Sequence, residues 1–384
     1  MLAGKSYLMI PGPTPVPPAV VAAMSRPVVG HRSADFADLY RRVADKLRRV
    51  CQTSNEVFVL TSSGTGAMET AVANVVRPGD KVLALITGNF GERFARIARA
   101  FGASVVEVNF GWGGAVDPQV VADYLRDREI KAVLATQNET STGVANDIAA
   151  LGRLLADHPA LLLVDAISGL GGMDIRTDEW GVDLLVGASQ KALMLPPGLA
   201  FVTVSPKAWR VIERNEGPRF YFDLQAARKA QTNWNTPFTP AVSLFFGLEA
   251  ALDMILAEGL PRVFERHALL AAAVRAAMRA LGLELLAPDE HASHTVTAVV
   301  GPEGVAVDEL RRVLYSRYGV SVAGGQGVLR GKIFRIAHMG FVDRADVLAV
   351  LAALEMALAE LNYPVALGSG VRAAQEVFLG RRQS

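Results

Sequence analysis

The chain has 384 residues, of which 51% are hydrophobic and 20% charged, and its formal net charge is +1. This balance excludes a disordered chain and makes nucleic acid an unexpected partner. The single cysteine, Cys51, excludes an internal disulfide, and no apolar stretch is long enough for a leader or a membrane span, so we expect a cytoplasmic protein without a membrane partner.

The chain length favours a large α/β domain with a smaller companion. Apolar residues at helical spacing predict an amphipathic helix over 35–50. Short β-branched or apolar runs then alternate with helical segments, and they predict strands at 56–60, 81–86, 104–108, 131–136, 160–165, 182–187 and 199–204. Strands spaced about one helix apart favour a mostly parallel seven-stranded sheet with helices on both faces.

The C-terminal third has a different pattern. A helical run over 241–281 is followed by predicted strands at 295–300, 320–324 and 332–338, and by predicted helices near 307–318 and 343–361. We interpret this part as a smaller α+β domain, and we make no prediction for 363–384. The expected division is an N-terminal arm at 1–18, a large domain at 19–258 and a small domain at 259–384.

The loop after the first predicted strand reads TSSGTG at 61–66. Backbone N–H groups at the start of the next helix would bind a phosphate there. A dinucleotide-binding fingerprint fails, because Glu69 occupies the third glycine position and no ribose-binding acid follows the next strand. For this loop alone, a tight turn without a ligand remains the alternative.

Two charged residues follow buried strands. Asp165 ends the strand at 160–165, where an unpaired carboxylate is costly, so it should have a cationic partner, although strand-end aspartates often only cap a loop. Of the eight lysines, Lys191 alone lies among small and apolar residues between two core strands. Desolvation lowers the pKa of a lysine and makes it a nucleophile for an aldehyde. The alternative is a surface lysine with its amine in water.

A single arginine, Arg335, interrupts the apolar run at 332–338. Its planar guanidinium matches a carboxylate, and the alternative is a strand residue that faces solvent. A phosphate loop, a strand-end aspartate, an aldehyde-binding lysine and a carboxylate-binding arginine are together typical of a pyridoxal 5'-phosphate (PLP) site for amino acids.

The sequence also resembles the class V PLP-dependent aminotransferases of fold type I, in particular the alanine–glyoxylate and serine–pyruvate branch. The resemblance covers residues 10 to 361, and its most specific segments are SSGTGAMETAV (62–72), NETSTGV (138–144), LLLVDAISGLGG (161–172), GASQKALMLPPG (187–198), TPFTPAVSLFFGLEAAL (236–252) and KIFRIAHMG (332–340). It implies transamination between a small amino acid, alanine or serine, and a small 2-oxo acid, glyoxylate or pyruvate. It also implies a homodimer with shared active sites.

The resemblance implies a role for each site residue. Lys191 and Asp165 are the expected catalytic residues, the first on the cofactor aldehyde and the second on its pyridine nitrogen. Arg335 would bind the substrate α-carboxylate, with Gly12 on the opposite wall. The other expected cofactor contacts are Ser63, Gly64, Thr65, Phe90, Thr140, Gln190 and, from the neighbouring subunit, Thr236 and Thr239.

Other functions remain open at this point. An aspartate-type aminotransferase would need a second cation, for which Arg32 is the candidate. A cysteine desulfurase-like lyase would need a mobile cysteine, whereas Cys51 is more typical of a small buried hydrophobe. A non-catalytic subunit could keep the fold, although the set of Lys191, Asp165 and Arg335 argues against it. The histidines lack the spacing of a metal site, so we expect no metal.

Overall fold

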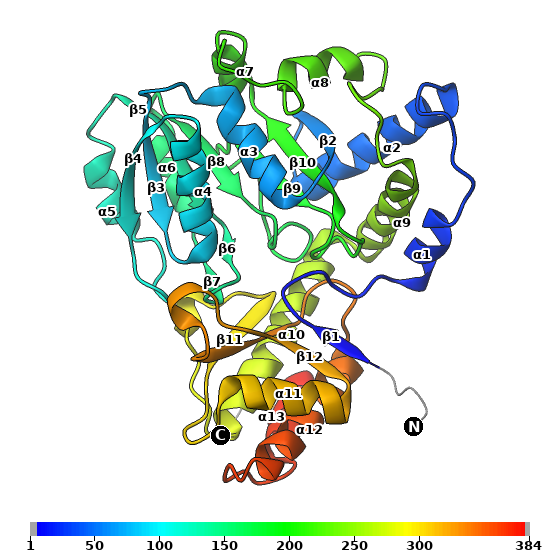
Figure 1. The fold of residues 1–384 in the computed structure, drawn as a ribbon, viewed down its shortest axis with the longest axis vertical. Coiled ribbons are helices and arrows are strands. Elements are labelled where there is room, and N and C mark those ends of the chain that lie inside the picture. Colours follow the sequence, from blue (N-terminus) through cyan, green and yellow to red (C-terminus); the bar gives the residue numbers. More distant parts are fainter. Residues whose placement is uncertain (1–5, 381–384) are drawn as a thin grey trace.

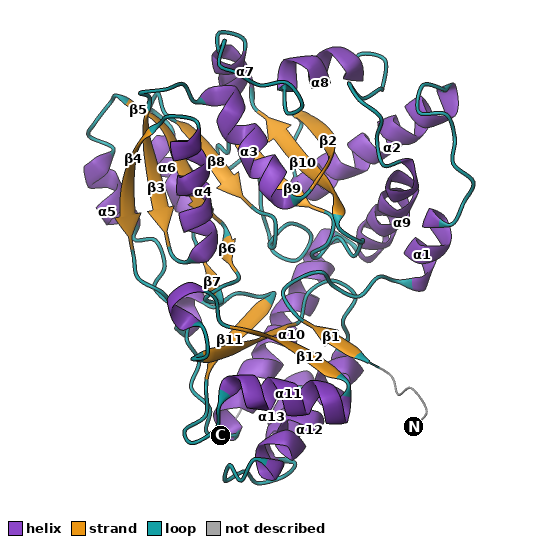
Figure 2. Ribbon diagram, viewed as in Figure 1, coloured by secondary structure: helices purple, strands orange, loops and turns teal. Residues whose placement is uncertain are grey.

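Two sheets organise the protein in this computed structural model, which describes residues 6–380. The larger sheet has seven strands in the order β2-β10-β9-β8-β5-β3-β4, and the smaller has four in the order β1-β12-β13-β11. The larger sheet fills the upper part of Figure 1, and the smaller sheet lies below it with helices beneath (Figures 1 and 2). This arrangement confirms the predicted fold class.

The strands of the larger sheet match the predicted ones to within two residues at either end. They are β2 (Glu56–Ser62), β3 (Lys81–Ile86), β4 (Ser104–Asn109), β5 (Ile130–Thr136), β8 (Leu161–Asp165), β9 (Leu184–Ala188) and β10 (Gly198–Val204). In this sheet β10 runs opposite to the other six strands, which share one direction. Every residue of β8 and β9 is buried, which explains their unbroken apolar sequences.

Helices cover both faces of the larger sheet, because alternate strand residues point to opposite sides. Leu83 and Leu85 of β3 join one apolar core, whereas Val82 and Ala84 join the other. The first core receives α2 (Ala34–Cys51), α5 (Pro118–Tyr124), α6 (Ile148–Leu155) and α9 (Val242–Glu258), with α1 (Pro18–Met24) at its edge. The second receives α3 (Gly64–Val75), α4 (Asn89–Ala100), α7 (Pro206–Ile212) and α8 (Leu224–Gln231).

The smaller sheet combines one strand from the N-terminal segment with three strands from the C-terminal third of the sequence. Its strands are β1 (Tyr7–Met9), β11 (Val296–Val300), β12 (Val320–Gly324) and β13 (Ile333–Ala337). Its helices are α10 (Leu260–Ala280), α11 (Val307–Tyr318), α12 (Arg344–Glu360) and α13 (Ser369–Phe378). Because β1 pairs in parallel with β12, part of the segment expected as an arm is a strand of this sheet.

Two details differ from the predicted elements. The helical run over 241–281 is two helices, since Gly259 adopts a φ of +86° and ends α9 before α10 begins. The segment without a prediction contains α13, whose Ala374 packs into the core of the small domain. Within residues 6–380, no helix is long and apolar enough to cross a membrane.

Candidate active site

The two predicted catalytic residues and the predicted phosphate loop lie at the carboxyl edge of the larger sheet. Asp165 is the last residue of β8, and Lys191 follows the end of β9 by three residues. The helix α3 begins at Gly64, directly after β2 and its N-cap Ser63. These three strands run in the same direction, so the loops after them open on one edge of the sheet.

The Lys191 amine is enclosed by the N-terminal segment. Its Nζ donates a hydrogen bond to the Pro11 carbonyl, and a Cβ on Gly12 would lie 2.6 Å from Nζ. Thr14 Oγ1 donates to the Lys191 carbonyl at 2.8 Å, which fixes the lysine loop. Burial lowers the pKa of Lys191 to about 8, although the nearby charge of Asp165 opposes this shift. The amine is therefore partly desolvated and not that of a surface lysine.

Asp165 is a buried carboxylate, 4% exposed, at the end of its strand. Burial raises its pKa to about 7, while the N–H of Ile167, which donates to Oδ1 at 2.9 Å, opposes the rise. The charges of Lys191 and Arg93 also favour the ionised form, but no ion pair to Asp165 is present within residues 6–380. A cationic group from a ligand would supply the partner that the sequence led us to expect.

Arg335 is 5% exposed on β13, so the alternative of a solvent-facing strand residue is wrong. Its Nε and Nη2 donate to the Gly324 carbonyl at 2.9 and 2.7 Å, and Nη1 donates to the Thr140 carbonyl at 2.8 Å. Burial lowers its pKa to about 10, which the charge of Glu139 opposes. A guanidinium has five N–H donors, so these three bonds leave donors for a carboxylate.

The start of α3 can accept an anion. The N-cap residue Ser63 makes no side-chain hydrogen bond to the first turn of α3, so the backbone N–H groups of this turn lack a side-chain cap from Ser63. A Cβ on Gly64 would lie 2.7 Å from Ile167 Cδ1, so a larger residue here would have to displace the Ile167 side chain. Next to Lys191, the buried Oε1 of Gln190 has no hydrogen-bond partner within the described part of the chain.

These features fit the cofactor that the resemblance implies. PLP brings an anionic phosphate, an aldehyde and a ring nitrogen that can carry a positive charge. The start of α3, the desolvated Lys191 amine and the unpaired Asp165 match these groups in turn. Within residues 6–380, no group of His, Cys, Asp and Glu side chains is arranged to hold a metal ion.

Two charged residues of the site were not predicted. The guanidinium carbon of Arg93 lies 4.8 Å from the centroid of the Phe90 ring, and its Nη1 donates to Thr65 Oγ1 at 3.2 Å. Glu139 is fully buried beside Thr140 and accepts hydrogen bonds from the start of α4. The sequence spacing could have indicated Arg93, because it follows Phe90 by three residues, so that both side chains lie on the same face of a helix. No sequence pattern connects Glu139 with α4.

Thr236 and Thr239 are not bonded to the other site residues within the described chain. Their segment lies beside β2, where the Ala241 N–H donates to Thr61 Oγ1 at 3.0 Å. Arg32 Nη1 donates to Asn235 Oδ1 at 2.6 Å and to the Thr236 carbonyl at 2.5 Å. Arg32 thus supports this segment, and the contact of Thr236 and Thr239 with a neighbouring subunit stays a prediction.

The single cysteine lies away from these residues. Cys51 is 0% exposed at the end of α2, and burial raises its pKa to about 12. A thiol in this position is neither ionised nor mobile. It is the small hydrophobe that its sequence position indicated, which argues against desulfurase chemistry.

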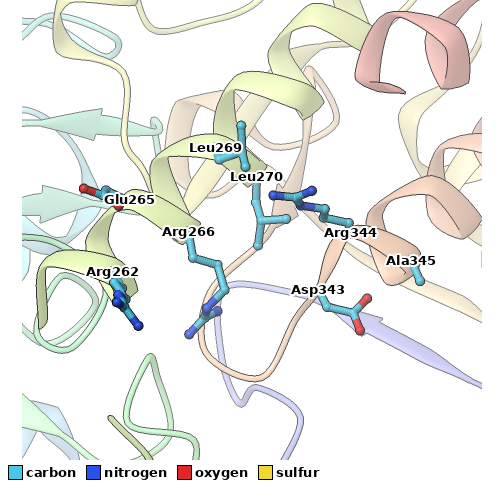
Figure 3. A pocket seen from close by; sticks show the side chains of 8 residues that line it. All are labelled: Arg262, Glu265, Arg266, Leu269, Leu270, Asp343, Arg344 and Ala345. Atoms are coloured by element: carbon cyan, nitrogen blue, oxygen red, sulfur yellow. The ribbon is translucent and has the colours of Figure 1, made fainter. Parts of the chain in front are cut away.

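A separate hollow of about 630 Å³ lies between α10 and the start of α12. Figure 3 shows its lining side chains, and none of them belongs to the site described above. Arg266, in its wall, donates to Glu258 Oε1 at 2.7 Å and to the Gly340 carbonyl at 3.0 Å. One of the lining residues, Arg266, therefore has a structural role, because it connects α10 to the segment before α12.

Comparisons with known proteins agree on one family. Residues 6–345 match the family model described as aminotransferase class V. The chain is 42% identical to an L-aspartate–glyoxylate aminotransferase of Paracoccus denitrificans, over 98% of this chain and 96% of that protein. It is 39% identical to a serine–glyoxylate aminotransferase of Arabidopsis thaliana, over 97% and 94%. The crystal structure of ureidoglycine–glyoxylate aminotransferase from Bacillus subtilis matches with a TM-score of 0.94 and 32% identity, over 99% of each chain.

Proposed function

The chain belongs to the class V aminotransferases, and we propose that it transfers the amino group of alanine or serine to glyoxylate or pyruvate, with Lys191, Asp165 and Arg335 as its central residues. PLP is the cofactor of this family. One observation carries the proposal: the Lys191 amine is desolvated, with a pKa of about 8, within the electrostatic reach of Asp165 and Arg335. This combination of an amine, an acid and a carboxylate-binding cation suits an amino acid substrate.

Each residue has a distinct task in the proposed reaction. When bound, PLP supplies an aldehyde that takes up amino groups and a ring that accepts electrons from the substrate. The Lys191 amine would hold the cofactor aldehyde, and its lowered pKa would let it remove and return the substrate Cα proton near neutral pH. Asp165 would stabilise a positive charge on the ring nitrogen. Arg335 would bind the α-carboxylate of the substrate.

Cofactor binding is proposed for the remaining predicted residues. Ser63, Gly64 and Thr65 at the start of α3, with Gln190, would hold the phosphate. Phe90 would stack on the ring, and Thr140 would lie near its phenolic oxygen. Gly12 would form the opposite wall, where a φ of +106° favours glycine and a Cβ would crowd the end of the Lys191 side chain.

A small substrate is favoured over a dicarboxylate. Arg335 binds one carboxylate, and Arg32, the earlier candidate for a second, already donates to Asn235 and Thr236. The three relatives described above are all named for glyoxylate, whereas their named donors differ. We therefore propose glyoxylate as the acceptor and expect alanine and serine to be better donors than aspartate.

Replacing Arg335 with alanine tests this assignment. The variant should lower kcat/KM for alanine and for glyoxylate by a similar factor, because one guanidinium binds the carboxylate of both substrates. We expect a loss of ~2–4 kcal/mol for a bidentate pair in a desolvated site. Steady-state kinetics with each substrate varied in turn would measure it, and Arg335→Lys should restore only part of the loss.

Arg32→Ala is the matched control in the same assay. It removes an arginine that contacts the 235–237 segment, so the ratio of kcat/KM for alanine to that for aspartate should not change. A strong preference of the wild type for aspartate that disappears in Arg32→Ala would contradict the proposed substrate class. A loss in Arg335→Ala confined to one of the two substrates would contradict the shared carboxylate site.

We also propose a homodimer in which the segment of Thr236 and Thr239 reaches the cofactor of the neighbouring subunit. The segment is held in place by Arg32 and by the Thr61 hydroxyl, so it is ordered for such a contact. Sedimentation of the PLP-loaded protein at micromolar concentration should give a dimer. A monomer that retains full cofactor and activity would refute the shared site.

The expected compartment is the cytoplasm. The single cysteine is buried and unpaired, which suits a reducing environment. The formal net charge of +1 provides no attraction for nucleic acid, and we propose neither nucleic acid nor a membrane as a partner.

A further inference from the structure

Glu139 is a buried carboxylate that the proposed reaction does not use. It lies on β6 (Asn138–Glu139), which forms a short hairpin with β7 (Val144–Ala145). Its Oε2 accepts the N–H of Phe90 at 2.8 Å and of Gly91 at 3.1 Å. Its Oε1 accepts the N–H and hydroxyl of Ser141 at 3.1 and 2.6 Å. Burial raises the pKa of Glu139, and these hydrogen bonds oppose the rise.

The two backbone donors belong to the first turn of α4, the helix that carries Phe90. Its N-cap residue, Gly88, has no side chain, so the cap comes from a different loop. Ser141 Oγ completes it by accepting the Asn89 N–H at 3.0 Å. A Cβ on Gly88 would lie 2.4 Å from Ser141 Oγ and 2.7 Å from Glu139 Cγ, so the contact is close-packed. A negative charge at this end also complements the helix dipole.

The same turn contacts the small domain on its other side. The carbonyl of Thr140 accepts the hydrogen bond from Arg335 Nη1, and the charge of Glu139 favours the protonated guanidinium. Residues 139–141 therefore bind the start of α4 and the substrate-binding arginine at once. A displacement of this turn would move the Phe90 ring relative to Arg335.

We propose that Glu139 is a positioning residue that fixes the Phe90 ring against the cofactor and holds it in register with Arg335. The inference rests on the proposed function, in which PLP lies against Phe90. Glu139 acts through the backbone of α4 and does not touch the reacting atoms. Replacing Glu139 should therefore weaken PLP binding. It should also change the visible circular dichroism of the bound PLP, even without substrate.

The test compares Glu139→Gln with Glu355→Gln. Glu355 is the matched control, because it is 3% exposed and also caps a helix: it accepts the N–H groups of Gly368, Gly370 and Val371 at the start of α13. In both variants an amide NH₂ would face a backbone N–H. Each protein is stripped of cofactor and titrated with PLP, and we follow the dissociation constant, the visible circular dichroism and the Tm.

Both variants should have a lower Tm, but only Glu139→Gln should bind PLP more weakly, by about tenfold or more, with a reduced visible dichroism. In a Phe90→Ala background, the Glu139→Gln change should add little to the PLP dissociation constant, since the two residues act as a unit. Equal PLP binding by Glu139→Gln and Glu355→Gln would overturn the proposal. So would additive effects of the Glu139 and Phe90 changes.

Ser141→Ala covers the case in which Glu139→Gln does not fold. This variant removes one donor to Glu139 and the acceptor for the Asn89 N–H, so PLP binding should weaken by about threefold, with a smaller dichroism change. An unchanged dissociation constant and dichroism in Ser141→Ala would then overturn the inference. Failure of the wild-type protein to bind PLP at all is a different result, because it would refute the proposed function itself.

Discussion

Replacing Lys191 with alanine is expected to lower kcat by roughly 10²–10⁴-fold, the range that a positioned general acid and base contributes. The Lys191 amine has the lowered pKa, about 8, that suits proton transfer near neutral pH, and burial is the main cause. Neighbouring Arg335 and Arg93 lower the pKa further, whereas Asp165 limits the effect. Rapid mixing of the PLP-loaded variant with alanine would measure the rate of amino-group transfer in a single turnover.

A chemical label provides an independent check on the same residue. Borohydride reduction of the PLP-loaded wild type, followed by peptide mapping, should mark Lys191 and no other lysine. Lys81→Ala is the control. Lys81 is the first residue of β3, at the sheet edge opposite the site, and its Nζ forms an ion pair with Asp127 at 2.5 Å. The Lys81→Ala variant should keep wild-type activity. A label on Lys81 or Lys332 would show that the aldehyde binds elsewhere.

Reasoning from the residues alone was most effective at the ends of core strands, whereas most of the cofactor contacts were predicted from the family resemblance. Asp165 and Lys191 stand out because the strands before them are fully buried, so a charge that follows directly is costly unless it has a role. Because β8 and β9 are parallel, the residues at and after their carboxyl ends lie at the same edge of the sheet. Arg335 was harder, since only the structure shows that its strand position is buried and not solvent-facing.

The parts that escaped prediction depend on contacts between distant segments. β1 pairs with β12, more than 300 residues later, and three residues of strand have no periodicity of their own. Glu139 caps α4 from 48 and 49 residues away, so no local motif reports it. α13 lies in a segment with mixed polarity, and its helical packing requires the surface that α10 and α12 provide.

Asp165→Asn should leave PLP bound but slow the removal of the substrate Cα proton by roughly 10²–10³-fold, comparable to the loss of one preorganised electrostatic contact. Asparagine has the size of aspartate, so the buried site, 4% exposed, keeps its packing while the negative charge is lost. Without that charge, a positive ring nitrogen is no longer stabilised, and the ring accepts electrons poorly. The exchange of the alanine Cα proton for deuterium, followed by NMR, isolates this step from product release.

Asp183→Asn separates this electrostatic role from a general effect of losing a buried carboxylate. Asp183 is equally buried, at 4% exposed, but it lies at the opposite edge of the sheet, where it accepts the Leu162 N–H at 3.0 Å and the Ser205 hydroxyl at 2.6 Å. Its replacement should lower the Tm and leave the deuterium exchange rate unchanged, since the residue supports the strands and not the cofactor ring. If Asp165→Asn instead behaved like Asp183→Asn, with near-normal exchange and only a lower Tm, the charge opposite the ring nitrogen would have to come from another acid.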